Sequence, residues 1–360
     1  MNHIYIFGAH SRAQTLGHYI TYLDNAVKIE AYLYDNDEEN PPYIDGVPVI
    51  KLDDGILLDE NYPVYLGVKG VFHEKKTLLF KEYGIKTIIP VDVDFDTKIR
   101  NEYLKKYFSN IGKPFVKIDD LEALKNDKRG SSASIYVINS IYDGELSERQ
   151  NYTRYHKVLQ VGCALSEEKI QCAKYRDDEG DNISCKNSQY SELTGLYWIW
   201  KNSKNNYVGL EHYRRHFILP ENWVDRVVEN DIDVILPVPL YVVPNIRQNY
   251  YDRHEKCDWE NMMEYLKKYL PDDYIKAKNF FDSTGLYSPC NMMITKKEAL
   301  DELCGWLFPI LFYIEELGGK RNNEYDNRYP GFVSERLVTF FFESRANKYK
   351  IVYADKNFLK

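Results

Sequence analysis

The chain has 360 residues, 44% hydrophobic and 28% charged, which is typical of soluble folded proteins and leaves room for two domains. Its formal net charge of −8 argues against general nucleic-acid binding, which needs a basic surface. No stretch approaches the ~20 apolar residues of a membrane span. The six cysteines have no C-x-x-C spacing and the first residues, "MNHIYIFGAH", lack a signal peptide, so we expect a cytoplasmic protein with reduced thiols.

Residues 1–95 alternate short apolar strands with helical segments. A strand at 2–7 ends at Gly8, helical spacing of apolar residues follows, and a strand at 29–37 ends in Asp35 and Asp37. A glycine turn and a later acid are typical of a nucleotide-binding half-fold, although "GAHSRAQTLG" lacks the G-x-G-x-x-G fingerprint. We predict a small, Rossmann-like parallel-sheet α/β domain here.

This segment resembles the N-terminal domain of the O-acyltransferases that act on nucleotide-linked amino sugars. The resemblance rests on "IYIFGAHSRA", "YLYDND", "IDGVPVI" and "IIPV", which occur in that order. His10 and Ser11 stand where that family has a ligand-contacting glycine pair, and no hexapeptide repeat of an acyltransferase half follows. The resemblance therefore implies a module for assembly or regulation rather than a cofactor site.

The rest of the chain is predicted to hold a connector and a second domain. Residues 96–130 are charged and are expected to form a helical connector that ends at the Gly130-Ser131-Ser132 turn. Residues 131–360 alternate strands and helices, which predicts a second α/β domain. Its expected elements include the strands "SIYVINSIYDG", "NYVGLEHYRRHF" and "YKIVYAD", and a long amphipathic stretch at 257–281.

A cluster of acids at positions 177–181 directly precedes a helical stretch with an apolar face. The register of Gly180 excludes a calcium loop, whose acids stand at the first, third and fifth places before its glycine. Ser184 is expected to cap the helix, so that the helix dipole stabilises the acids. Alternatively the loop binds a ligand, with Asn182 and Asn187 supplying amide groups suited to sugar hydroxyls.

Charged and imidazole side chains crowd the end of the predicted strand "YVGLEHYRRHF", where open α/β sheets bind ligands. Arg214 and Arg215 suit a diphosphate, because each guanidinium donates two hydrogen bonds in one plane. His212 and His216 are four residues apart, a spacing that does not form a zincin-type metal site at a strand end.

The segment "YDNRYPGFVSERLVTFF" holds the candidate catalytic base. Pro330-Gly331 is expected to interrupt the chain, and Ser334 to cap a helix whose first turn contains Glu335. A carboxylate can take the proton from an acceptor hydroxyl, so Glu335 is the first candidate and Asp326 the second. His254 is a third candidate. Glu335 has an alternative role in stabilising the helix terminus or pairing with Arg328 or Arg336.

The motifs "RDDEGDNIS", "ELTGLYWIWKN", "YVGLEHYRR", "NMMI", "WLFPIL" and "GFVSERL" resemble, in this order, a domain family of capsule and exopolysaccharide gene clusters. The resemblance covers residues 133–355. That family was long a domain of unknown function; it is now treated as GT-A-type glycosyltransferases and includes bacterial galactofuranosyltransferases. The resemblance implies inverting hexosyl transfer from a nucleotide-diphosphate sugar, with UDP-galactofuranose as the leading donor. The implied acceptor is a saccharide or a polyprenyl-linked saccharide at the inner face of the cell membrane.

On this resemblance the GT-A-like domain is predicted to bind its donor through charged and amide side chains. They are Arg176, Asp177, Asp178, Asp181, Asn182, Lys186, Asn187, Glu211, His212, Arg214, Arg215, Asn291 and Arg328. No D-x-D motif stands at a strand end, and "GLEHYRR" occupies the place expected for it. Either Glu211 and His212 hold Mg²⁺ or Mn²⁺, or Arg214 and Arg215 replace the metal; both alternatives stay open.

Two other functions fit the sequence less well. One is a non-catalytic scaffold that binds nucleotide sugars and recruits other enzymes of polysaccharide assembly. The other is an NAD-dependent oxidoreductase or epimerase that uses the first domain, and the missing glycine fingerprint argues against it. The 32 tyrosines suit surfaces that stack on sugar rings, although compositional bias explains the same count.

Overall fold

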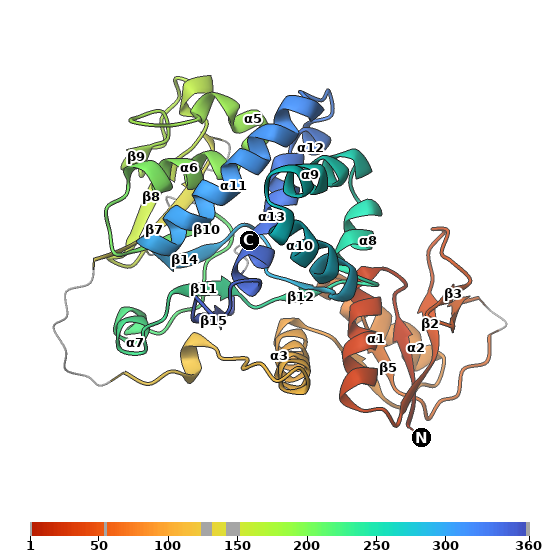
Figure 1. Cartoon of the computed structure of the whole chain (residues 1–360). Coiled ribbons are helices and arrows are strands. Elements are labelled where there is room, and N and C mark those ends of the chain that lie inside the picture. The colour runs from red at the N-terminus through yellow and green to blue at the C-terminus, as the bar shows by residue number, and fades with distance from the viewer. Residues whose placement is uncertain (1, 54–55, 124–131, 142–151, 358–360) are drawn as a thin grey trace. The chain divides into compact units, whose positions relative to one another are not determined.

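A computed structural model describes residues 2–53, 56–123, 132–141 and 152–357 (Figure 1). The chain divides into two compact units, Met1–Phe115 and Val116–Lys360. Within the described ranges, no helix is long and apolar enough to cross a membrane.

The first unit is a six-stranded sheet in the order β3-β4-β2-β1-β5-β6. All its ladders are parallel except the one between β3 and β4. The central strand β1 (Asn2–Phe7) ends in four buried residues, as expected for a parallel strand covered on both faces. The predicted parallel α/β domain is therefore confirmed. The other elements are α1 (Ser11–Leu23), β2 (Val27–Tyr34), β3 (Tyr43–Ile44), β4 (Val47–Lys51), β5 (Val64–Leu66), η1 (Gly70–Phe72), α2 (His73–Glu82) and β6 (Ile88–Pro90).

The segment expected to be a connector is largely helix α3 (Val93–Asn110), which belongs to the first unit. Asp92 caps this helix by accepting a hydrogen bond from the Phe95 N–H at 2.8 Å. The helix packs on α1 through aromatic rings, with Tyr19 and Tyr103 centroids 4.7 Å apart. The division after Phe115 thus lies inside the expected connector, and the expected turn at 130–131 lies outside the described residues.

The second unit is built on a seven-stranded sheet in the order β15-β11-β14-β10-β7-β8-β9. Strand β14 runs antiparallel to both neighbours, and the other ladders are parallel. The carboxyl ends of β7, β8 and β10 therefore meet the amino end of β14 at one edge. The strands are β7 (Ala133–Asn139), β8 (His156–Gln160), β9 (Tyr175–Arg176), β10 (Tyr207–His212), β11 (Val234–Pro237), β14 (Met293–Lys296) and β15 (Ile351–Ala354), beside a hairpin of β12 (Leu240–Tyr241) and β13 (Leu286–Tyr287).

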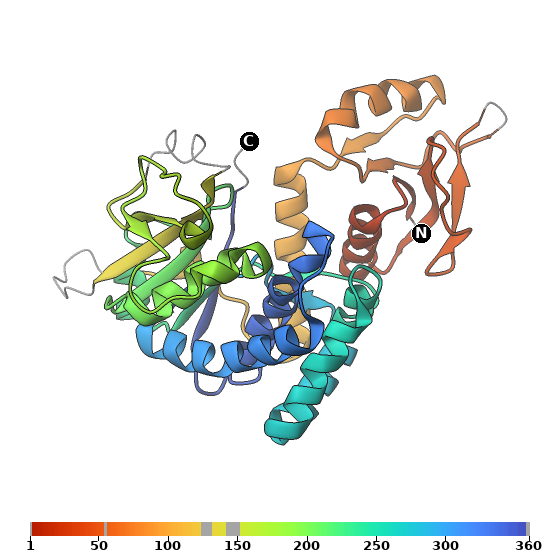
Figure 2. The same ribbon diagram turned by 90° about the horizontal axis from the view of Figure 1, so that it is seen from above.

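Helices cover both faces of this sheet. Helices α6 and α11 pack on the strands around β10 (Figure 2). Gly195 lets α6 approach closely, since a Cβ there would lie 2.4 Å from the Ile138 side chain. A second apolar cluster joins β10 and β11 to α7. The helices are α5 (Asn187–Tyr190), α6 (Glu192–Asn202), α7 (Trp223–Glu229), α8 (Ile246–Tyr251), α9 (Lys256–Tyr269), α10 (Pro271–Ser283), α11 (Lys297–Gly318), α12 (Glu324–Asn327) and α13 (Tyr329–Glu343), with short turns η2 (Ile118–Asp120), η4 (Cys163–Leu165) and η5 (Ser184–Lys186).

Two expected helix starts are wrong. Helix α6 begins at Glu192, and the Ser184 hydroxyl binds a carboxylate instead of capping it. Pro330 does not interrupt the chain, because a proline in the first turn of a helix removes no intrahelical hydrogen bond. Helix α13 therefore starts at Tyr329, Ser334 lies inside it, and Glu335 is one turn further along than expected.

The stretch at 257–281 is two helices, α9 and α10.

Candidate functional site

A turn of unusual backbone geometry lies at the carboxyl edge of the second sheet. Cys290 and Asn291, just before β14, have φ values of 77° and 50°. Residues other than glycine seldom adopt this left-handed region, and such strain is concentrated at functional sites. His212 ends β10 beside this turn, and its Nε2–H donates to the Cys290 carbonyl at 2.6 Å.

Glu335 of α13 faces the same turn. Its Oε1 accepts a hydrogen bond from the Cys290 N–H at 2.8 Å, and its Oε2 lies 2.9 Å from Arg336 Nη1. Burial raises the pKa of Glu335 and the charge of Glu192 adds to the shift, while Arg336 opposes it. The side chain nevertheless keeps 20% of its surface exposed. A partly exposed carboxylate with a raised pKa is suited to accept a proton from a bound hydroxyl.

Glu192 is a second carboxylate at this edge. Its Oε1 accepts from Asn291 Nδ2 at 2.8 Å, and the same amide donates to the Gly331 carbonyl at 3.1 Å. Asn291 Oδ1 is buried and has no hydrogen-bond partner among the described residues. The residue before Glu192, Ser191, also has a positive φ of 47°. Sequence reasoning missed Glu192, because an acid at the start of a helix is ordinarily a dipole partner.

Two arginines bring positive charge to the surroundings of His212 and Glu335. Arg215 acts electrostatically on both Glu335 and His212, and Arg328 acts on His212. Arg328 Nε also donates to the Ser191 hydroxyl at 2.9 Å. Burial lowers the pKa of His212; the charge of Glu192 opposes this shift and the two arginines reinforce it. The structure therefore brings together five of the residues singled out in the sequence: Glu335, His212, Asn291, Arg215 and Arg328.

The acids of the 177–182 loop have a different environment. Asp177 is fully buried, and its carboxylate accepts four hydrogen bonds. The donors are the Gly162 and Cys163 N–H groups, both at 3.0 Å, and the Ser184 and Thr194 hydroxyls at 2.5 and 2.7 Å. Because a carboxylate has about four acceptor positions, Asp177 is saturated by the protein itself. It joins η4, η5 and α6.

The neighbours of Asp177 also bind groups of the protein. Asp178 pairs with Arg176 at 3.0 Å, and Asp181 accepts from the Tyr197 hydroxyl at 3.2 Å. Asn182 donates to backbone carbonyls within its own loop. These contacts stabilise the conformation of the loop. The carboxylate oxygens of its acids do not face a common point at which a metal ion could bind.

Lys186 and Asn187 connect the loop to the site rather than line it. Lys186 pairs with Glu315 of α11 at 2.5 Å. Asn187 Nδ2 donates to the Ser191 carbonyl at 2.8 Å and to Thr194 Oγ1 at 2.9 Å. Thr194 in turn donates to Asp177. The acid-rich loop therefore supports the strained backbone that precedes Glu192. Arg214 is exposed, with its guanidinium 5.0 Å from the Tyr213 ring centroid.

The two remaining catalytic candidates lie in other surroundings. His254 stacks on Phe332 with centroids 4.2 Å apart, and burial lowers its pKa to about 4. An imidazole with that pKa is a weak base at neutral pH. Asp326 lines a polar cavity of about 490 Å³ together with Arg321 and Asn323, and the lining of this cavity does not include Glu335.

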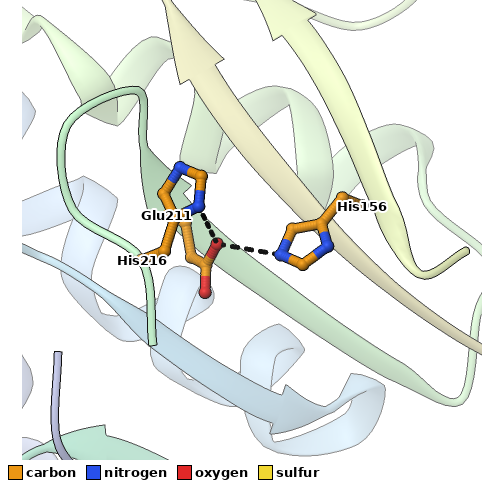
Figure 3. Close-up of side chains that lie close together, drawn as sticks. All are labelled: His156, Glu211 and His216. Atoms are coloured by element: carbon orange, nitrogen blue, oxygen red, sulfur yellow. Dashed lines mark ion pairs between the residues drawn. The ribbon is translucent and has the colours of Figure 1, made fainter. Parts of the chain in front are cut away.

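A second cluster consists of His156, Glu211 and His216 (Figure 3). Successive side chains of a strand point to opposite faces, so Glu211 faces away from His212. The predicted pairing of Glu211 with His212 in a metal site is therefore not formed. Instead, Glu211 Oε2 lies 3.2 Å from His156 Nε2 and 4.0 Å from His216 Nδ1. These three residues could hold a metal ion.

The first unit has a cavity of its own at the carboxyl edge of its sheet. It measures about 240 Å³ and is lined by residues that include Gly8, His10, Asp35 and Lys76. Lys76 pairs with Asp35, and His10 pairs with Glu38 at 2.7 Å. Pockets for small-molecule ligands usually measure about 300–1,000 Å³, so this cavity is small for a dinucleotide.

A family model described as "Domain of unknown function (DUF4422)" matches residues 147–347, more than half of the chain. The protein belongs to the DUF4422 family. Among solved structures, this DUF4422 chain is similar to the apo structure of WbbM, a bifunctional glycosyltransferase, with 26% identity and a TM-score of 0.53. The match covers 64% of this chain and 45% of WbbM, so the chain spans less than half of that protein.

Two solved structures of lower similarity also match parts of the chain. One is core-mannan synthase A from Aspergillus fumigatus in a Mn/GDP form, with 13% identity, a TM-score of 0.30, and coverage of 68% of this chain and 79% of that one. The other is mouse xyloside xylosyltransferase 1, with 9% identity, a TM-score of 0.28, and coverage of 62% and 84%. Scores this low carry no argument for function. No curated protein sequence matches the chain. The likeness to WbbM confirms the predicted fold class.

Proposed function

We propose that the second unit transfers a glycosyl group from a nucleoside-diphosphate sugar to a saccharide hydroxyl. The observation that carries this proposal is the environment of Glu335. It is a partly exposed carboxylate with a raised pKa, close to a second carboxylate and two arginines, and it binds the strained turn at Cys290. The likeness to a bifunctional glycosyltransferase supports the same reaction class.

In the proposed reaction Glu335 acts as the general base. It takes the proton of the acceptor hydroxyl while that oxygen attacks the anomeric carbon of the donor. The bond from this carbon to the diphosphate oxygen breaks, and the nucleoside diphosphate leaves with the electron pair. One displacement of this kind inverts the anomeric centre. A positioned base of this type contributes about 10²–10⁴-fold to the rate.

Arg215 and Arg328 are proposed to bind the diphosphate. Guanidinium groups form strong, paired hydrogen bonds with phosphate oxygens, and their charge stabilises the leaving group as the glycosidic bond breaks. Both act electrostatically on His212 at the sheet edge. Glu192 and the unpartnered Asn291 Oδ1 are proposed to accept hydrogen bonds from sugar hydroxyls.

The finer features of the reaction rest on the family resemblance. We propose a UDP-linked donor, with UDP-galactofuranose first among hexosyl donors. The proposed acceptor is a capsule or exopolysaccharide saccharide, free or polyprenyl-linked, reached at the inner face of the cell membrane. The first unit is proposed to serve assembly or regulation.

The acids of the 177–182 loop do not fit the Mg²⁺ or Mn²⁺ that many such enzymes place against the diphosphate. Both ions favour oxygen-rich sites, and Asp177 already accepts four hydrogen bonds from the protein. Asp178 is paired with Arg176, and Glu211 faces two imidazoles. The proposed reaction therefore uses the arginines and no metal-dependent step.

The proposal is tested by incubating the full chain with a panel of UDP-, GDP- and dTDP-sugars and saccharide acceptors. We expect acceptor-dependent release of nucleoside diphosphate and a new glycoside for at least one donor. If nucleotide sugars bind and no pair gives product, the non-catalytic scaffold replaces the enzyme as the better account.

A further inference from the structure

The His156–Glu211–His216 cluster is held so that one polar atom of each side chain faces a common centre (Figure 3). Glu211 Oε1 accepts the Phe217 N–H at 2.8 Å, which leaves Oε2 for the centre. His156 Nδ1 lies 2.7 Å from Thr153 Oγ1, which turns Nε2 toward Glu211. Such outer contacts are what fix the orientation of metal-ligating histidines.

The spacing of these atoms suits a small tetrahedral cation. Ligand atoms bound at about 2.0–2.1 Å around a tetrahedral zinc lie roughly 3.3 Å from one another. The measured separations from Glu211 Oε2 are 3.2 Å to His156 Nε2 and 4.0 Å to His216 Nδ1. Glu211 Oε2 and His156 Nε2 are already at this spacing, His216 Nδ1 lies about 0.7 Å too far from Glu211 Oε2, and all three atoms lie within 4.8 Å of one another. Movement of the His216 ring toward the other two side chains would complete the ligand set.

The buried negative charge of Glu211 also favours the binding of a cation. Glu211 is fully buried, and among the described residues its carboxylate has ion-pair contacts only with the two imidazoles, without a lysine or arginine. Burying an ionised carboxylate without a permanent positive partner costs roughly several kcal/mol of free energy relative to leaving it in water. His216 Nε2 is also buried and has no hydrogen-bond partner in the described part of the chain.

Without a metal, the ion pair with His156 accounts for part of this geometry, and Glu211 Oε2 has no hydrogen-bond partner among the described residues. The Thr153 N–H donates to His156 Nδ1 at 3.1 Å, which places the ring proton on Nε2, the nitrogen that lies 3.2 Å from Glu211 Oε2. When a cation takes the Nε2 lone pair, the ring proton moves to Nδ1, and Nδ1–H donates to Thr153 Oγ1 instead. Thr153 thus offers a partner for either tautomer.

Aromatic packing closes one side of the cluster. The Tyr152 ring lies 5.6 Å from the His156 ring and 5.9 Å from the His216 ring, centroid to centroid. The two imidazoles are themselves stacked at 5.8 Å. The side chains of His156, Glu211 and His216 are 12%, 0% and 13% exposed. The three side chains are therefore shielded from solvent, and a tetrahedral ion held by them would keep its fourth position for water or another small ligand.

We propose that His156, Glu211 and His216 form a binding site for Zn²⁺. Two imidazoles and one carboxylate are a frequent zinc ligand set, whereas Mg²⁺ favours oxygen ligands alone. The ion ties the start of β8 to the end of β10 and to the turn that carries Arg214 and Arg215. It lies on the face of β10 opposite His212, so the proposal does not depend on glycosyl transfer.

The test measures metal binding by the full chain, without an activity assay. Protein is dialysed against chelator, then against ZnCl₂, and its zinc is measured by plasma mass spectrometry. We expect about one zinc per chain and a higher melting temperature than in the chelated protein. Glu211→Gln and His216→Gln are expected to lose the zinc. His10→Gln is the matched control, because it removes an exposed histidine paired with a glutamate.

Cobalt substitution separates loss of ligands from loss of fold. Co²⁺ in a tetrahedral imidazole–carboxylate site gives visible absorption bands, which we expect in the wild type and not in Glu211→Gln. If the wild-type chain keeps no zinc and shows no such bands, or if the variants bind as much metal as the wild type, the cluster is a hydrogen-bonded ion pair and the proposal fails.

Discussion

Asp177 and Glu335 are both acids held in the second unit, and their surroundings differ in every respect that matters for chemistry. Asp177 is fully buried and accepts four hydrogen bonds from the protein. Glu335 accepts one backbone N–H and one guanidinium, keeps 20% of its surface exposed and has a raised pKa. The acid-rich loop attracts attention in the sequence, yet the isolated glutamate in α13 is the one placed to react.

The difference shows that the number of acids in a stretch says little about a site. What decides is whether the acceptor positions of each carboxylate are already filled. Asp177 supports the site from a distance, because Thr194 and Asn187 link it to the strained Ser191 backbone. Glu335 lies outside this network and keeps 20% of its side chain exposed to a ligand.

The largest effect on folding is expected for Asp177→Ala. The substitution leaves two buried N–H groups and two hydroxyls without their acceptor, so we expect a loss of roughly 3 kcal/mol or more in the free energy of unfolding. Urea denaturation measures this change. Asp178→Ala is the control, because its pair with Arg176 is partly exposed and its loss should cost under about 1 kcal/mol. If both variants lose the same free energy of unfolding, Asp177 has no special structural role in the loop.

A smaller effect, confined to the KM for the donor, is expected for Arg328→Met. Loss of one charged hydrogen-bonding group should raise the KM for the nucleotide sugar about tenfold and change acceptor KM little. Steady-state kinetics with each substrate varied in turn tests this. Arg247→Met is a matched control, since that arginine pairs with Asp282 on α10. An unchanged donor KM in Arg328→Met would exclude the proposed diphosphate contact.

The pH dependence of the reaction should report on Glu335. Because its pKa is raised, the carboxylate becomes an active base only above the ordinary range for glutamate, and kcat/KM should fall as the pH drops through that raised pKa. Arg336 holds the pKa down, so Arg336→Met should move this acid limb to higher pH. A limb that stays in place in Arg336→Met would show that another group is the base.

The smallest expected effect is a gain in stability of Glu335→Gln at neutral pH. A carboxyl whose pKa is raised by folding favours the folded state below its unfolded pKa, and this contribution is lost as the pH rises through the folded value. Gln carries no charge to desolvate, so the variant should melt slightly higher than the wild type at pH 7–8 and not at pH 4. Thermal melting at both values tests the sign; a lower melting temperature at neutral pH would contradict it.

Much of this site could be predicted from the sequence, because local patterns decide where strands end. His212 and Arg215 follow an apolar strand, and Asn291 precedes another, so their position at the sheet edge follows from the strands themselves. The environment of Asp177 could not be predicted, since it depends on Gly162 and Cys163 in a separate segment.

The metal cluster shows a further limit. His156 meets Glu211 only because β7 lies between β8 and β10 in the sheet, an order that no local pattern specifies. Side-chain alternation along β10 could have shown that Glu211 and His212 face apart. The position of Glu192 in the site could not be predicted either, because its sequence pattern is that of any acid at the start of a helix.

The central claim, that Glu335 is the base for glycosyl transfer, is tested most directly by comparing donor binding with transfer in Glu335→Gln. We predict that the variant binds the nucleotide sugar with nearly wild-type affinity and transfers it about 10²–10⁴-fold more slowly. Glu302→Gln, which removes a surface carboxylate paired with Lys348, should transfer at the wild-type rate. Transfer by Glu335→Gln at the wild-type rate would contradict the account.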